Sequence, residues 1–291
     1  MAGKTLPNLK DKPYGGAKFI ADTDVTATVK IHCRPYNVGN VQEFLHDYAA
    51  WMKQGHNIHG IDDFKYLDYA NGSTEVFDKF YVKYTNKRLR LWRGEYFYHQ
   101  IQAREYFKEF AWIDDEEIDE NDVLVVSMPF SDTGGIAPGY QQVLERCEEL
   151  GVPVMLDMAY INLSKSSNFN VYFKCIEVIA TSLSKVFPVA HMRIGMRLMR
   201  NFVDDTLSAY TNQSDPYVNT SSVDVGHHLI KMYSPQWLWQ KYHLKQHEIC
   251  NELGVAPSNC VIFGIDHLNK YDEYSRGRET NRLCFSRLWS K

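Results

Sequence analysis

The chain has 291 residues, 44% of them hydrophobic and 23% charged, and a formal net charge of −4. This length can bury a large core and fits one large domain with a smaller appendage. Because acidic and basic residues are interspersed, and no apolar run reaches the roughly 20 residues of a membrane span, the sequence predicts contact with neither nucleic acid nor a membrane.

The cysteines indicate the compartment. They are scattered, form no CxxC pair, and several lie within apolar runs such as 173–180. We therefore expect buried free thiols in a cytoplasmic protein, and residues 1–19 lack the apolar segment of a secretory signal. The six are Cys33, Cys147, Cys175, Cys250, Cys260 and Cys284.

The first third of the chain mixes helical and extended patterns. Residues 1–30 are polar and rich in Gly and Pro, which predicts an arm with weak strands. Apolar side chains recur at helical spacing over 41–53. The next expected elements are a strand at 64–69, a helix that begins at Ser73 or Thr74, a strand at 88–92 and a helix at 98–110.

The rest of the chain alternates strands with helices. This alternation predicts an α/β fold, with a mostly parallel sheet flanked by helices and a small α+β C-terminal subdomain. We divide the chain into an arm (1–35), a large domain (36–215) and a small domain (216–291). The expected strands are 122–127, 152–157, 176–180, 259–265 and 282–288, and the expected helices are 140–150, 202–212, 222–233 and 235–253.

Two of these apolar runs, 152–157 and 176–180, end in clusters of polar residues. Ligands of a parallel sheet lie beyond the carboxyl ends of its strands, so we expect the two clusters to converge. The first contains Asp157 and Tyr160, and the second contains Ser182, Ser184, Lys185 and Arg193.

Each of these side chains has an ordinary interpretation beside a catalytic one. A lysine beyond a buried strand can have a lowered pKa and join an aldehyde, but Lys185 also fits a solvated loop. Asp157 can bind a metal, act as a catalytic base, pair with a protonated ring nitrogen or cap a helix. Arg193 suits a phosphate or a surface ion pair. Ser182 and Ser184 can donate to the same phosphate or cap a turn.

Two upstream segments add further candidates. Gly72 permits close backbone approach, and the helix after it directs free N–H groups at an anion, although a string such as 71–74 is commonly a simple turn. Tyr96 follows the strand at 88–92 within a Gly-Glu-Tyr turn. Its ring can stack on a flat cofactor or pack in the core.

The order and spacing of these residues resemble the fold-type I pyridoxal phosphate (PLP) enzymes, specifically the class I/II aminotransferase family. The similarity runs from about Tyr36 to Arg287. The family motif P-x-N-P-T-G corresponds to 129–134 and D-x-A-Y to 157–160. The family's S-x-S-K with an arginine eight residues later corresponds to Ser182, Ser184, Lys185 and Arg193.

The resemblance implies a PLP-transferase fold of type I, PLP as cofactor and a role for each candidate. Lys185 would hold PLP as a Schiff base and then move the substrate α-proton. Asp157 would pair with the pyridinium nitrogen, Tyr160 with the phenolic oxygen, and Tyr96 would stack on the ring. The phosphate would be held by Gly72, Ser73, Thr74, Ser182 and Arg193, with Ser184 beside them.

The resemblance also implies how the substrate and a second subunit are bound. Arg282 would grip the substrate α-carboxylate, with Arg276, Arg278 and Arg287 as nearby rivals. The family builds its sites at a homodimer interface, where Tyr36 would reach the neighbouring subunit's phosphate.

One departure from the family pattern lies in the cofactor-binding loop. Ser131 stands where the family has asparagine, and Asp132 where it has proline. The usual amide donor to the ring's phenolic oxygen is therefore shortened or lost.

These features predict a PLP-dependent aminotransferase that moves an amino group between an amino acid and a 2-oxo acid. The alternatives are a PLP-dependent lyase or decarboxylase on the same scaffold, and a shortened, non-catalytic family member that acts as a binding module. His243 and His247 are spaced i, i+4 but form no HExxH pattern, so we expect no metal site.

Overall fold

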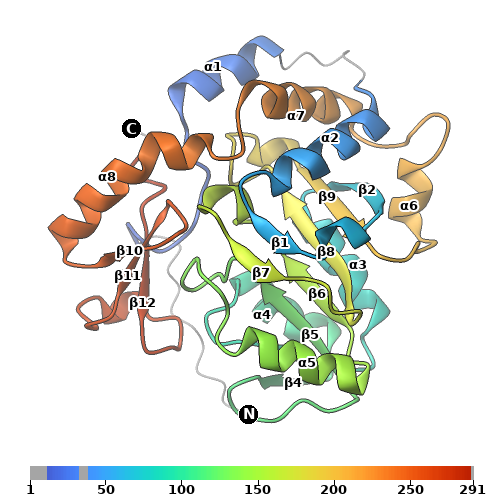
Figure 1. The fold of residues 1–291 in the computed structure, drawn as a ribbon, viewed down its shortest axis with the longest axis horizontal. Coiled ribbons are helices and arrows are strands. Elements are labelled where there is room, and N and C mark those ends of the chain that lie inside the picture. Colours follow the sequence, from blue (N-terminus) through green and yellow to red (C-terminus); the bar gives the residue numbers. More distant parts are fainter. Residues whose placement is uncertain (1–11, 33–38, 290–291) are drawn as a thin grey trace.

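The computed structural model describes residues 12–32 and 39–289 (Figure 1). Cys33, Tyr36 and the first residues of the predicted large domain lie outside the described residues. In the part of the chain that is described, no helix is both long and apolar enough to cross a membrane.

A seven-stranded sheet forms the centre of the larger part of the molecule, with strand order β2-β9-β8-β6-β5-β3-β4. β9 runs antiparallel to both of its neighbours, and the other strand pairs are parallel. This confirms the mostly parallel α/β sheet. The strands are β2 (Tyr66–Asn71), β3 (Arg88–Leu91), β4 (Glu109–Trp112), β5 (Asp122–Ser127), β6 (Val154–Asp157), β8 (Ile176–Ser182) and β9 (Ile194–Met199).

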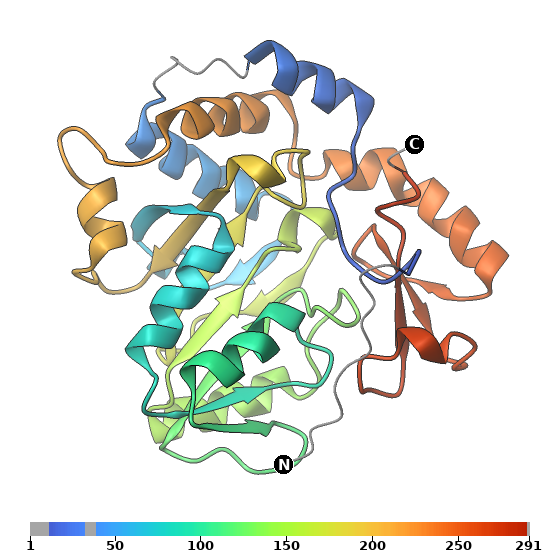
Figure 2. The same cartoon turned by 180° about the vertical axis from the view of Figure 1, so that it is seen from behind.

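Helices cover both faces of this sheet. Alternate residues of β5 point to opposite faces, so Leu124 and Val126 join one apolar cluster while Val123 and Val125 join another. The first cluster lies under α2 (Val41–Lys53), α5 (Tyr140–Leu150) and α7 (Thr220–Met232). The second lies under α3 (Ser73–Lys83) and α4 (Phe97–Tyr106), on the face seen in Figure 2.

The C-terminal part forms the expected small α+β subdomain beside the large sheet (Figure 1). Its antiparallel sheet contains β10 (Ala256–Pro257), β11 (Phe263–Asp266) and β12 (Asn281–Cys284). α8 (Trp237–Leu253) packs on it and ends at Gly254, whose φ of +68° lies in the left-handed region that favours glycine.

Short elements connect these layers. β1 (Asn57–His59) and β7 (Asn168–Asn170) form a separate two-stranded parallel sheet. The 3₁₀ turns are η1 (Ile61–Asp63), η2 (Ile161–Leu163), η3 (Ala190–Met192) and η4 (Asp272–Tyr274).

For the described part of the N-terminal arm, the expectation of weak strands was wrong, because residues 23–32 form helix α1 (Thr23–His32). Oδ1 of Asp22 accepts hydrogen bonds from the backbone N–H groups of Asp24 (2.9 Å) and Val25 (3.2 Å), which starts the helix. Asp22 is itself held by Lys241 and Tyr242 of α8. Asp22 thus connects the start of α1 to α8 through a contact between residues 220 positions apart.

The helix expected at 98–110 was too long, and a strand was missed. α4 ends at Tyr106, and residues 109–112 form the edge strand β4. On β4 the ring centres of Phe110 and Trp112 lie 4.8 Å apart. β9 was not expected because Arg197 interrupts its apolar run. Arg197 is nevertheless buried, since Asp68 and Asp205 each accept from its guanidinium at 2.6 Å.

The expected boundary between the domains at 215/216 stays a prediction. α6 (Thr206–Thr211) precedes it, capped by the Asp205 carboxylate. α7 follows it but packs on α2 and β9 of the large sheet, whereas α8 packs on β10 and β11 of the small one.

Candidate active site

A cleft opens at one edge of the large sheet. The parallel strands β2, β3, β6 and β8 end at this edge, and β9 begins there because it runs the opposite way. Loops from distant parts of the sequence therefore meet. Most of the predicted site residues line the cleft, together with Ala159: Ser73, Thr74, Tyr96, Asp157, Tyr160, Ser182, Ser184, Lys185 and Arg193.

Lys185 lies just beyond β8, and its side chain is largely enclosed. Burial lowers the pKa of Lys185, and the charges of Arg282 and Arg193 lower it further, while Asp157 acts in the opposite direction. Its Nζ donates a hydrogen bond to the backbone carbonyl of Ala17 at 3.0 Å. A lysine with a lowered pKa has more of the neutral amine at neutral pH, which is the form that attacks an aldehyde.

The Ala17 contact was missed by the sequence reasoning. The segment 12–22 runs along the C-terminal subdomain (Figure 2), where the Cys284 N–H donates to the Tyr14 carbonyl at 2.9 Å. The Lys18 N–H donates to Ser286 Oγ, also at 2.9 Å. Because Ala17 and Lys185 are 168 positions apart, only the tertiary fold brings them together.

Asp157 ends β6 with its carboxylate buried at the cleft. Its Oδ1 accepts from the Ala159 N–H at 3.0 Å, and its Oδ2 lies 3.5 Å from Nε2 of His99. The other ring nitrogen of His99 contacts the hydroxyl of Tyr81. His99 was missed as well, and its position three residues after Tyr96 on α4 was the only available signal.

The start of α3 and Arg193 form a polar cradle. Gly72 precedes α3, no side chain caps the helix, and its first residues Ser73 and Thr74 line the cleft. Nη2 of Arg193 donates to Thr74 Oγ1 at 2.9 Å. Arg193 has a φ of +56°, unusual for a residue with a side chain. Ser182 Oγ lies 2.8 Å from Ser184 Oγ. A guanidinium, hydroxyls and a helix N-terminus together suit a phosphate.

Gly72→Ala is expected to weaken PLP binding about tenfold, the loss of one charge-assisted hydrogen bond. A Cβ at Gly72 would lie 2.2 Å from Nη2 of Arg193, so the guanidinium must move. The dissociation constant is measured by absorbance titration with PLP. Gly151→Ala is the matched control, because Gly151 also has a positive φ (+64°) but nothing lies within 4 Å of its added Cβ. Equal PLP affinity in the two variants would contradict the cradle.

Tyr160 and Tyr96 border the cleft as neutral phenols. Burial raises the pKa of Tyr160, while Arg282 and Arg276 act to lower it. Burial also raises the pKa of Tyr96, with Asp157 adding to the effect. Neutral phenols can donate hydrogen bonds to a bound molecule.

Ser131 and Arg282 lie behind the cleft and are not among the residues that line it. Ser131 is fully buried, and its carbonyl accepts from the guanidinium of Arg282. The guanidinium of Arg282 also lies 4.5 Å from the centre of the Phe263 ring. Their predicted roles toward cofactor and substrate therefore stay predictions.

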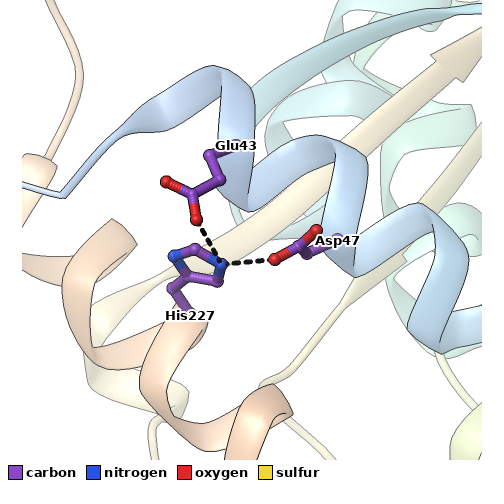
Figure 3. A group of neighbouring side chains, drawn as sticks. All are labelled: Glu43, Asp47 and His227. Carbon is purple, nitrogen blue, oxygen red and sulfur yellow. Dashed lines mark hydrogen bonds and ion pairs between the residues drawn. The ribbon is translucent and has the colours of Figure 1, made fainter.

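Glu43, Asp47 and His227 form the only group among the described residues with the spacing of a metal site (Figure 3). His227 Nε2 lies 2.7 Å from Asp47 Oδ2, and Lys231 Nζ lies 3.2 Å from Glu43 Oε1. Because an ammonium already neutralises these carboxylates, we interpret the group as an ion-pair network between α2 and α7.

The five described cysteines are free and buried, which confirms that part of the prediction. Burial raises the pKa of the thiols of Cys147, Cys175, Cys250 and Cys260. None of the four lines the cleft.

Comparison with solved structures shows the fold. The chain is similar to an aromatic aminotransferase from Pyrococcus horikoshii OT3 (TM-score 0.65, 11% identity, 94% of this chain and 89% of that one). It is also similar to a PLP-bound C-S lyase from Staphylococcus hominis (TM-score 0.69, 11% identity, 94% of this chain and 86% of that one). A third similar structure is L-threonine-O-3-phosphate decarboxylase from Porphyromonas gingivalis (TM-score 0.60, 14% identity, 94% of this chain and 97% of that one). Identities this low show the fold alone.

Sequence comparison adds a match between part of the chain and one family model. No curated protein matches the chain, but residues 108–236 match the family model "Aminotransferase class I and II". This segment contains Ser131, Asp157, Tyr160, Lys185 and Arg193. Residues 108–236 are therefore similar to the class I and II aminotransferases, and the chain has the fold of the fold-type I PLP-dependent enzymes.

Proposed function

We propose that this protein is a PLP-dependent aminotransferase that moves an amino group between an amino acid and a 2-oxo acid. The observation that carries the proposal is the meeting of Lys185, Asp157 and Arg193 in one cleft. An enclosed amine, a buried carboxylate and an anion cradle correspond to the three reactive parts of PLP, which are its aldehyde, its ring nitrogen and its phosphate.

The residues present fit the cofactor. Arg193, Ser182 and the start of α3 would hold the phosphate, because they supply a guanidinium, a hydroxyl and free N–H groups. Asp157 would accept a hydrogen bond from the ring nitrogen. Tyr160 would donate to the phenolic oxygen. When bound, PLP acts as an electron sink that stabilises negative charge at the substrate α-carbon.

Lys185 would move the proton at the substrate α-carbon. A general base must lie within hydrogen-bond reach of that carbon, and the Lys185 amine is tethered in the cleft. The lowered pKa of Lys185 keeps more of the amine neutral, so it can accept a proton. Arg282 would bind the substrate carboxylate from the C-terminal subdomain.

A lyase or decarboxylase is the second candidate. The structural similarity extends to a C-S lyase and to a decarboxylase as well as to an aminotransferase, and a shared fold does not decide which bond breaks. The cleft, which is lined by hydroxyl groups, one amine and one guanidinium, is compatible with each of these reactions.

A single-turnover experiment tests the proposal. The PLP-loaded protein is mixed with one amino acid at a time, without a 2-oxo acid acceptor, and the products are separated. An aminotransferase is expected to convert PLP stoichiometrically to pyridoxamine phosphate with release of a 2-oxo acid. Release of CO₂ or of a side-chain fragment with PLP unchanged would contradict transamination and favour the second candidate.

The assembly and location complete the proposal. We propose a homodimer, from the family resemblance, and a cytoplasmic protein. The five buried free thiols support the second point.

A further inference from the structure

Arg276 is a buried cation that the proposed reaction does not yet use. It belongs to the C-terminal subdomain and is only 6% exposed. Its Nη1 donates to the Ser131 carbonyl at 2.7 Å, and its Nη2 donates to the Glu95 carbonyl at 2.8 Å. One side chain from the small subdomain thus joins two loops of the large domain, at Ser131 and at Glu95.

The hydroxyl of Ser131 lies against the same guanidinium. Ser131 Oγ is 3.3 Å from Nη1 and 3.4 Å from Nη2 of Arg276. Glu95 immediately precedes Tyr96, which lines the cleft. Arg276 therefore contacts the residue before one cleft residue and fills the space beside a short side chain in the loop after β5.

Asp132 carries the nearest carboxyl group to Arg276; burial raises the pKa of Asp132, while Arg276, Arg282 and Arg278 act to lower it. Asp132 is fully buried, its Oδ1 lies 3.8 Å from Nη1 of Arg276, and neither carboxylate oxygen has a hydrogen-bond partner among the described residues. A buried carboxylate without hydrogen bonds is unfavourable unless a nearby charge compensates for it. The ionisable groups that face Arg276 are Asp132, Glu95, Tyr160 and Arg282.

The charge of Arg276 affects the pKa of Tyr160, which lines the cleft. Arg282 and Arg276 both act to lower the pKa of the Tyr160 phenol, against the effect of burial. In turn, burial and Arg282 lower the pKa of Arg276 to about 10, while Asp132 and Tyr160 act to raise it. Arg276 remains protonated at neutral pH, so it supplies a fixed positive charge behind Tyr160.

We propose that Arg276 is a positioning residue that the C-terminal subdomain contributes to this site: its guanidinium holds the loops at Ser131 and Glu95 and sets the positive potential beside Tyr160. Asp132 moderates that potential. The proposal rests on the proposed function, because the potential matters only if PLP lies against Tyr160.

Opposite substitutions in this pair test the proposal with a spectroscopic readout. The visible absorbance of bound PLP is titrated with pH in the intact protein, and the midpoint is compared between variants. Arg276→Gln removes a positive charge and favours the protonated form, so the midpoint is expected to rise by about one unit. Asp132→Asn removes a negative charge, so the midpoint is expected to fall. A purely structural disturbance would not give shifts of opposite sign.

Two further variants serve as controls. Arg276→Lys keeps the charge and is expected to remain near the wild-type midpoint. Arg278→Lys keeps the charge but disturbs a neighbouring contact between the subdomain and the large domain, the 3.3 Å pair of Arg278 with Asp114, and is expected to leave the midpoint unchanged.

The outcomes distinguish this inference from the proposed function. PLP binding by Arg276→Gln with an unchanged midpoint would overturn the role of Arg276. If that variant does not fold, Asp132→Asn provides the test. An absorbance midpoint that does not fall in Asp132→Asn would also overturn the role of Arg276. Absence of PLP binding by the wild-type protein would instead defeat the proposed function.

Discussion

Lys185→Ala is expected to remove the visible absorbance that the wild-type protein acquires with PLP and to lower turnover by roughly 10³-fold, as for loss of a general acid–base group. The variant lacks the only amine that lines the cleft within the described residues. PLP would still meet Arg193 and Asp157, so it should bind, but reversibly. Borohydride treatment followed by mass analysis measures this, because only the wild-type protein should retain the cofactor covalently.

A matched lysine outside the cleft provides the control. Lys165 is exposed and lies over the ring of Trp239, so Lys165→Ala should behave like the wild-type protein. Turnover that survives in Lys185→Ala would disprove the assigned role of this lysine. A wild-type protein that stays colourless with PLP would favour the alternative of a non-catalytic binding module.

The pH dependence of PLP capture follows from the same group. Burial lowers the pKa of Lys185, so the amine stays neutral to a lower pH than an exposed lysine does. The rate of borohydride-trapped PLP incorporation at Lys185 should therefore begin to fall at a lower pH than the rate of incorporation at surface lysines. Identical pH profiles would show that Lys185 titrates as an ordinary lysine.

Arg90→Met is expected to lower the free energy of unfolding by about 3–5 kcal/mol, the range for breaking a buried ion pair. Arg90 lies on β3 with no exposed surface, and its Nη1 donates to Asp122 Oδ2 at 2.5 Å and to the Glu117 carbonyl at 2.7 Å. Its Nη2 donates to the carbonyls of Trp112 and Glu116. Methionine fills the space but leaves Asp122 with fewer partners and several carbonyls unpaired.

Urea unfolding measures this effect, with the midpoint compared at unchanged slope. Arg93→Ala is the control, since Arg93 pairs with Asp115 at 2.7 Å on a half-exposed surface. Exposed pairs contribute about 0–1 kcal/mol. A loss for Arg90→Met no larger than that for Arg93→Ala would contradict the structural importance of the buried pair.

Much of the site could be predicted because its residues follow strands in a fixed order. Asp157 and Lys185 come directly after apolar runs, and a parallel sheet brings the ends of its strands to one edge. The proximity of Asp157 and Lys185 can therefore be predicted from the parallel directions of their two strands. Arg193 fitted less simply, since it reaches that edge only because β9 runs antiparallel to β8, and β9 itself was not expected.

The contacts that tune the site could not be predicted in this way. His99 faces Asp157, Ala17 binds the Lys185 amine, and Arg276 holds Ser131. Each pair joins residues from separate segments of the chain. The local sequence around one residue of a pair does not predict its contact with the other. The position of helix α1 shows the same limit, because Asp22, which caps the helix, also contacts Lys241 and Tyr242 of α8.

By itself, the amino-acid sequence indicated the α/β class, the mostly parallel sheet and most of the polar groups at its edge, because hydrophobic period, turn residues and the succession of elements along the chain are visible in it. Only the tertiary structure decided which of those groups line the cleft and which lie behind it. Arg282 and Ser131 were assigned to the site from the family motifs, as Lys185 was, yet they contact each other and are not among the residues that line the cleft. The physical reason is that burial and charge compensation depend on every neighbour in space, and here those neighbours come from both the large domain and the C-terminal subdomain.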